Sequence, residues 1–92
     1  MLRRVVVTGL GAVSPNGIGQ REFWENTCKG ISGIDRITSF DPVNLACQIA
    51  GEVTNFDPSL YYSSADLKKL PRTVPLAVAA TQEALASAGI DL

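Results

Sequence analysis

The feature that most constrains the fold is a valine-rich segment that leads directly into a series of glycines. Residues Val5–Val7 form a continuous β-branched run, which is typical of a strand covered on both faces, as in the parallel sheets of α/β proteins. Gly9, Gly11 and Gly17 follow and mark backbone that needs positive φ or the close approach of other atoms. The sequence therefore predicts a buried strand that ends in a glycine turn.

The same glycines raise the question of a nucleotide-binding turn. A phosphate cradle needs a strand, a glycine turn and a helix N-terminus in immediate succession. Here Gly9–Ser14 lacks the third glycine of the dinucleotide fingerprint, and Ser14–Gly17 inserts a second turn before a helix can begin. An ordinary strand-to-loop turn is therefore favoured, and a nucleotide-dependent oxidoreductase is only the third alternative for the function.

A short helix and a second strand are predicted next. Residues 20–29 have the pattern of an amphipathic helix with Trp24 as a core anchor, and Gly30 is placed to end it. Residues 30–42 carry glycine, serine, aspartate and proline around isolated isoleucines, which predicts an ordered loop. Residues 46–53 follow with the composition of a strand.

Two more helical segments are predicted in the last third of the chain. A short basic helical turn is expected over residues 66–70, with Ser63 or Ser64 as its N-cap and Pro71 as its stop. A longer helix is expected to follow this turn closely. The two segments would then be separated by only a short connection around the proline.

The longer helix is predicted to run to Ala88, with Thr73 as its N-cap, Pro75 in its first turn and Gly89 at the C′ position. Its interior is apolar around nearly the whole circumference, through residues Leu76, Ala77, Val78, Ala79, Ala80, Ala84, Leu85 and Ala86. A helix that is apolar all round is a buried one. The other predicted elements do not supply that cover, so the chain is expected to be incomplete as a domain.

The composition is that of an ordinary globular protein. The 92-residue chain has 46% hydrophobic residues, 18% charged residues and a formal net charge of −1, which indicates neither a disordered tail nor a nucleic-acid-binding domain. The apolar segment near the N-terminus is too short for a signal peptide or a membrane span. A cytoplasmic protein is therefore expected.

The chain has no histidine and two cysteines, Cys28 and Cys47, without C-x-x-C spacing. Neither a zinc site nor a disulfide framework is predicted, and no metal or cofactor is expected. Cys28 lies near the C-terminal end of its predicted helix, where the helix dipole disfavours a thiolate. Cys47 lies on an apolar strand face. Both are therefore expected to be reduced packing residues and not nucleophiles.

The opening strand, the double turn and several later landmarks resemble the β-ketoacyl-[acyl carrier protein] synthases, the condensing enzymes of fatty-acid elongation. The likeness follows the family's order and spacing along essentially the whole chain, at Phe23-Trp24, Gly30–Ile34, Phe40-Asp41, Ala50-Gly51 and Ser87–Ile90. It implies that residues 1–92 are the N-terminal segment of a ketosynthase N-terminal domain, without an internal boundary. The implied fold class is α/β, as the N-terminal part of a thiolase-like α-β-α-β-α sandwich.

The chemistry that the resemblance implies lies outside this chain. Members of the family join an acyl group, held as a thioester on a cysteine, to a carbanion made by decarboxylating a malonyl thioester. Two histidines, or a histidine and an asparagine, stabilise the thioester oxygen. None of these residues is matched here, so no catalytic residue is assigned and the segment alone is expected to be inactive. The complete protein is expected to be a homodimeric acyltransferase.

Two alternatives to fatty-acid elongation are open at this point. The first is a polyketide ketosynthase or its inactive chain-length partner, which would be distinguished by the presence or absence of the active cysteine downstream. The second belongs to another class, a non-catalytic fragment that binds a carrier or takes part in assembly. Independent folding of the 92-residue chain would favour the second.

A basic cluster, Lys68, Lys69 and Arg72, is the one positive signal for a binding site. In the resembled family the equivalent segment is basic and borders the entrance for the carrier's pantetheine arm. Because carrier proteins are acidic, the resemblance implies docking of an acyl carrier protein at these three residues. Pro71 stands where the elongating type often has an acidic residue, and Pro75 replaces a polar one. An ordinary solvated basic patch is the alternative.

Overall fold

A computed structural model describes residues 2–60 and 62–91 of the chain. In chain order its elements are β1 (Val13–Ser14), β2 (Gly17–Ile18), α1 (Gln20–Cys28), β3 (Ile34–Arg36), β4 (Ile49–Gly51), a 3₁₀ turn (Pro58–Leu60), α2 (Ser64–Leu67) and α3 (Thr73–Ala88). The strands form two separate antiparallel pairs, β1 with β2 and β3 with β4. The content of helices and short strands is that of an α/β segment.

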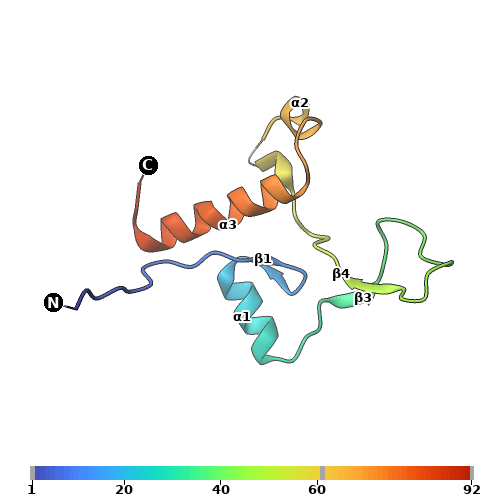
Figure 1. Ribbon diagram of the computed structural model, residues 1–92, viewed down its shortest axis with the longest axis horizontal. Helices are drawn as coiled ribbons and strands as arrows, with labels where there is room; N and C mark the ends of the chain where they lie inside the picture. Colours follow the sequence, from blue (N-terminus) through green and yellow to red (C-terminus); the bar gives the residue numbers. More distant parts are fainter. Residues whose placement is uncertain (1, 61, 92) are drawn as a thin grey trace.

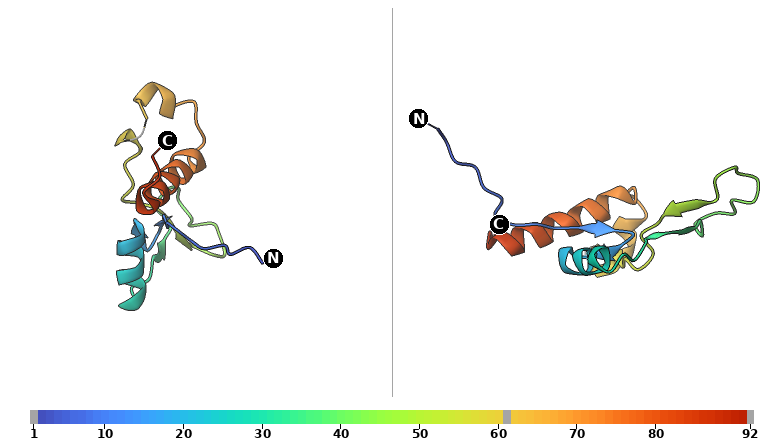
Figure 2. Two further views of the ribbon diagram at one scale, coloured as in Figure 1. Left: turned by 90° about the vertical axis from the view of Figure 1, so that its left-hand side faces the viewer. Right: turned by 90° about the horizontal axis from the view of Figure 1, so that it is seen from below.

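One group of elements packs together in space, and the remaining elements lie outside it. The β1–β2 hairpin, α1 and α3 lie together (Figure 1), and Gly9 and Gly11 lie against α3. The β3–β4 hairpin projects away from this group, as the view from below shows (Figure 2). The α2 turn lies beyond the N-terminal end of α3 and is joined to it by a short connection.

Both longer helices end as the sequence predicts. Gly30 has a φ of 72° and Gly89 a φ of 74°, the left-handed conformation that glycine adopts most easily. After α1, the N–H of Ile31 donates to the Asn26 carbonyl over 2.9 Å. After α3, the N–H of Ile90 donates to the Leu85 carbonyl over 2.9 Å. These bonds satisfy carbonyls that a helix end would otherwise leave without partners.

The starts of the last two helices differ in part from the prediction. Ser63 caps α2 as expected, by accepting from the Asp66 N–H, so the helix occupies residues 64–67 and not 66–70. Thr73 is the first helical residue of α3 and not its cap, and Arg72 takes the cap position without a side-chain bond. The reason is that the Pro71 carbonyl accepts from the Val74 N–H over 3.1 Å, which starts the turn one residue earlier.

The predicted opening strand is wrong for this chain. Val5, Val6 and Val7 are 92%, 69% and 78% exposed, and no strand is assigned over them. A strand needs a hydrogen-bonded neighbour, and no described residue forms one beside this segment. The predicted 46–53 strand is likewise reduced to Ile49–Gly51, and its partner β3 lies within the predicted loop.

The expected burial of the two helices is also wrong in this chain. Trp24 is 64% exposed and does not anchor a core. In α3 only Pro75 and Ala79 are buried among the described residues, because the elements that pack on α3 cover one of its sides. Most of the other apolar residues of the helix are half-buried, and Ala77 and Ala86 are exposed.

The chain as a whole is open. Its radius of gyration is 16.5 Å, compared with about 12 Å expected for a compact domain of this length. Its accessible surface is 7282 Å², where a compact monomer of this mass would expose about 5,200 Å². The excess of about 2,000 Å² is the size of a substantial protein interface, and much of it is apolar.

Candidate functional site

Gly9 and Gly11 do not form the predicted turn, and the backbone around them packs closely against α3. A Cβ placed on Gly11 would overlap the carbonyl oxygen of Ala80, and one on Gly9 would overlap that of Ala84. The Gly9 Cβ would also lie 2.7 Å from the Ala88 nitrogen. Ala80, Ala84 and Ala88 recur every fourth residue and so form a small-residue stripe on one side of the helix. The two glycines therefore allow backbone to lie directly on this stripe.

The helix N-terminus that follows the glycine-rich segment is already occupied by a carboxylate. Glu83, on α3, accepts from the Gln20 N–H at both of its oxygens, over 3.1 and 3.0 Å, and from the Ala12 N–H over 2.8 Å. Gly19, which precedes α1, offers no side-chain cap of its own. Glu83 thus supplies the anion that the helix dipole favours. A phosphate at this position would meet a negative charge, which argues against the nucleotide-binding alternative.

The three residues of the basic cluster are all exposed, but the structure does not place them in equivalent surroundings. Lys68 and Lys69 follow α2 directly, and over residues 2–60 and 62–91 their side chains make no hydrogen bond or ion pair. Arg72 lies just before α3 and donates from Nη2 to the Val53 carbonyl over 2.7 Å. Among the described residues, the cluster therefore consists of two ammonium groups without a partner and one guanidinium that is bound to backbone.

A second carboxylate, that of Glu52, binds the loop that follows β3. Glu52 accepts from the Thr38 N–H over 2.8 Å, from the Thr38 hydroxyl over 3.0 Å and from the Ser39 N–H over 3.0 Å. Hydrogen bonding by the Ser39 side chain, and then by the backbone amides of Thr38 and Ser39, lowers the pKa of Glu52 from 4.5 to about 2. Glu52 is therefore ionised at neutral pH and holds the start of the loop between β3 and β4.

The two cysteines are unpaired in the structure, and they are not packing residues. Both are exposed, which corrects the expectation of burial. The Cys28 side chain leaves the end of a helix none of whose residues is buried. The Cys47 thiol lies 3.5 Å from the Ile49 carbonyl. Within the described parts of the chain, no group of acidic, cysteine or histidine side chains is arranged to hold a metal.

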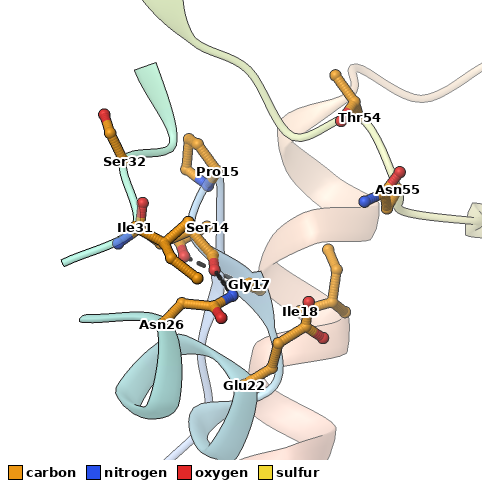
Figure 3. Close-up of a pocket in the computed structure, with 11 residues that line it drawn as sticks. Ser14, Pro15, Gly17, Ile18, Glu22, Asn26, Ile31, Ser32, Thr54 and Asn55 are labelled. Carbon is orange, nitrogen blue, oxygen red and sulfur yellow. Dashed lines mark hydrogen bonds between the residues drawn. The ribbon is translucent and has the colours of Figure 1, made fainter. Parts of the chain in front are cut away.

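A small polar hollow lies between the β1–β2 turn, α1 and the segment after β4 (Figure 3). Its volume is about 120 Å³, room for about four waters. The Asn26 amide donates across it to the Asn16 carbonyl over 2.6 Å, and the Ser14 hydroxyl donates to the Gly17 carbonyl over 3.1 Å. These bonds stabilise the β1–β2 turn, so Ser14 and Asn26, which line the hollow, have a structural role.

Sequence reasoning missed both carboxylates. Glu83 lies 71 residues from Ala12 and 63 from Gln20, and no local motif signals a cap supplied over such a distance. The only available hint was a single acidic residue inside a largely apolar helix. Glu52 carried no signal, because its partners belong to a loop with no regular pattern.

Among the described residues, none of the helices has the length and apolar composition of a membrane span.

Comparison with known proteins places these features in a family. Residues 2–92 match the model of the beta-ketoacyl synthase N-terminal domain. The 3-oxoacyl-[acyl-carrier-protein] synthase 2 of Staphylococcus aureus is 37% identical over 90 residues, which cover 98% of this chain and 22% of that protein. The tetracenomycin polyketide synthase ketoacyl synthase beta subunit of Streptomyces glaucescens is 44% identical over 87 residues, 95% of this chain and 21% of that protein.

A solved structure agrees with these matches. The ishigamide ketosynthase/chain length factor superposes with a TM-score of 0.84 at 36% identity, covering 97% of this chain and 22% of that one. The chain therefore belongs to the β-ketoacyl synthase family. It spans about a fifth of the length of the relatives that it matches, and the resemblance inferred from its sequence is confirmed.

Proposed function

We propose that this chain is the N-terminal segment of a β-ketoacyl synthase that carries out decarboxylative Claisen condensation. The observation that carries the proposal is the family match over residues 2–92. The fold we propose is the first part of a thiolase-like α-β-α-β-α sandwich, with residues 1–92 as one piece without an internal boundary. The excess surface and the exposed valine segment support a segment that packs against further protein.

In the proposed reaction, an acyl group first forms a thioester with an enzyme cysteine. Loss of CO₂ from a malonyl thioester leaves a carbanion, which attacks the acyl carbonyl, so that a carbon–carbon bond forms and the enzyme thiolate leaves. Cys28 and Cys47 are not proposed for this role, because both are exposed and the chain has no histidine to act as their base. We therefore assign the reacting groups to residues outside this chain, and expect a homodimer for the complete protein.

Fatty-acid elongation and polyketide synthesis are the two candidate settings. The landmarks in the sequence led us to fatty-acid elongation, and the synthase 2 relative of Staphylococcus aureus supports it. The beta subunit of a polyketide synthase, which is 44% identical to this chain, supports the polyketide setting equally. A polyketide chain-length partner without an active cysteine belongs to this second candidate.

We further propose that Lys68 and Lys69 bind an acidic acyl carrier protein, with Arg72 at the edge of the same surface. The two free ammonium groups follow α2 and have no partner within the described residues, which supports a role in meeting an external acidic surface. Exposed charges of this kind steer the encounter and make it sensitive to salt. The chemical site would not be affected directly.

The test uses the complete protein that contains this segment. It is assayed for decarboxylation and condensation with malonyl-acyl carrier protein, and its products separate the fatty-acid and polyketide settings. Lys68→Glu/Lys69→Glu should raise KM for malonyl-acyl carrier protein by about tenfold at low salt, while malonyl-CoA, which has no carrier protein, should react as before. Absence of condensation by the complete protein would refute the enzymatic proposal. Equal losses with both substrates would make the lysines structural.

A further inference from the structure

The basic cluster contains one residue that is bound differently from the other two. Arg72 Nη2 donates to the Val53 carbonyl over 2.7 Å, between residues that are 19 positions apart in sequence. This is the long-range contact that ties the connection between α2 and α3 to the end of the β3–β4 hairpin. A guanidinium that is held on backbone has less freedom to reorient toward a partner than the two free lysines.

The carbonyl that Arg72 binds belongs to a segment that is itself held from the other side. Glu52, the residue before Val53, accepts three hydrogen bonds from Thr38 and Ser39. These residues and Leu76 surround one hollow of about 720 Å³ beside α3. The segment at residues 52–53 is therefore fixed to the 38–39 loop by its carboxylate and to the start of α3 by its carbonyl.

Arg72 and Glu52 do not pair with each other directly. Within the described residues the one ion pair is Arg21 with Glu25 on α1. The Glu52 carboxylate is used by backbone and hydroxyl donors, and the Arg72 guanidinium by a neutral carbonyl. What Arg72 contributes is thus a directed hydrogen bond, in which its planar donor group fixes a position.

The geometry points to Arg72 as a positioning residue for the carrier-docking surface, and not as a direct contact to the carrier. By holding the α2–α3 connection on Val53, it sets where the end of α2 presents Lys68 and Lys69. This assignment rests on the proposed docking function of the two lysines. Under this assignment, Lys68 and Lys69 supply the charge that contacts the partner, and the hydrogen bond of Arg72 fixes the position of that charge.

The assignment predicts different responses to salt. Neutralising a residue that meets the acidic partner removes an attraction that salt would screen, so the dependence of kcat/KM on ionic strength becomes flatter. Removing a positioning bond weakens docking at every ionic strength and leaves the slope unchanged. A hydrogen-bonding side chain without charge at position 72 should restore part of the loss.

The experiment compares four variants of the complete protein: Lys68→Gln/Lys69→Gln, Arg72→Met, Arg72→Gln and, as a matched control, Arg21→Met. Arg21 is exposed on α1 and pairs only with Glu25 among the described residues. For each variant, kcat and KM are measured with malonyl-acyl carrier protein at ionic strengths from about 25 to about 300 mM. Malonyl-CoA serves as the substrate without a carrier, and melting temperatures are recorded.

The lysine variant should lose about tenfold in kcat/KM for the carrier substrate at low salt, with a flatter slope. Arg72→Met should lose about threefold, through KM and with the slope of the wild type, and Arg72→Gln should recover part of this loss. Arg21→Met should behave as the wild type with both substrates.

Two results would overturn the assignment of Arg72 alone. The first is an Arg72→Met variant, matched by Arg72→Gln, that flattens the salt dependence as the lysine variant does, which would make Arg72 a direct charge contact. The second is an Arg72→Met variant with a lower melting temperature and an unchanged KM, which would make the bond merely structural. If the lysine variant leaves KM for the carrier substrate unchanged, the proposed docking function itself fails.

Discussion

The packed group of elements in this chain and the second group, which lies outside it, depend on different kinds of interaction. In the first group, α3 packs on the N-terminal segment so closely that a Cβ at Gly11 would overlap the Ala80 carbonyl. The Glu83 carboxylate, on α3, accepts from the Gln20 N–H at the start of α1 and so links the two helices. In the second group, the β3–β4 hairpin and α2 depend on exposed hydrogen bonds, such as those of Glu52 and Arg72.

The difference determines what each group is sensitive to. Close packing is destroyed by added volume, because the neighbouring backbone has no free space to move into. Exposed polar bonds tolerate volume but respond to charge and pH, since water competes for the same donors and acceptors. Substitutions chosen for volume should therefore act on the first group, and changes of charge on the second.

The largest effect is expected from volume added in the first group. Gly11→Ala in the complete protein should lower the free energy of unfolding by about 3 kcal/mol, because its Cβ meets the Ala80 carbonyl. Gly30→Ala is the matched control, since it keeps a strained φ of 72° but has no atom within 4 Å of the added Cβ, and it should cost about 1 kcal/mol. Denaturant unfolding measures both. Equal costs would show that the α3 contact does not contribute.

A smaller effect is expected where the first group depends on a charge. Glu83→Ala removes the carboxylate that accepts from Ala12 and Gln20 and should cost about 2 kcal/mol. Glu25→Ala, which breaks an exposed ion pair with Arg21, should cost about 0.4 kcal/mol. The two melting curves are compared at neutral pH. A Glu83 variant as stable as the Glu25 variant would contradict the capping role.

In the second group, the loop that Glu52 holds should lose its stability as the pH is lowered. The folded pKa of Glu52 is about 2, below its ordinary value of 4.5, so the carboxylate stabilises the folded loop fully above about pH 4.5. This stabilisation is lost as the pH falls from about 4.5 toward about 2. Hydrogen exchange at the Thr38 and Ser39 amides, corrected for the intrinsic rates, should show protection disappearing over this range. Glu52→Gln should lack this transition, and a variant that kept it would identify another group as its cause.

The smallest effect is expected at the two thiols. Both cysteines are exposed, so Cys28→Ser and Cys47→Ser should each change stability by less than about 0.5 kcal/mol. Condensation by the complete protein should continue at the wild-type rate. A mechanism-based thiol inhibitor should label a cysteine outside this chain, and labelling of Cys28 with matching loss of turnover would reassign the nucleophile.

Interactions of short range could be predicted from the sequence alone. Gly30 and Gly89 end their helices as predicted, and Ser63 caps α2, because each of these features depends on residues within a single turn. The family could also be inferred, since its landmarks lie in order along the whole chain. For the candidate docking surface, the sequence identified the three basic side chains but not the bond that separates Arg72 from the lysines.

Burial and long-range partners were decided only by the tertiary structure. The valine segment and Trp24 have the composition of buried elements, yet they are exposed because no described element packs on them. The role of Gly11 depends on backbone near residue 80, and the capping of α1 depends on a carboxylate 63 residues away. A sequence pattern specifies which surfaces are apolar and which turns are favourable, because those depend on neighbouring residues. It does not specify which distant atoms will meet them, because that is set by how the elements pack together in space.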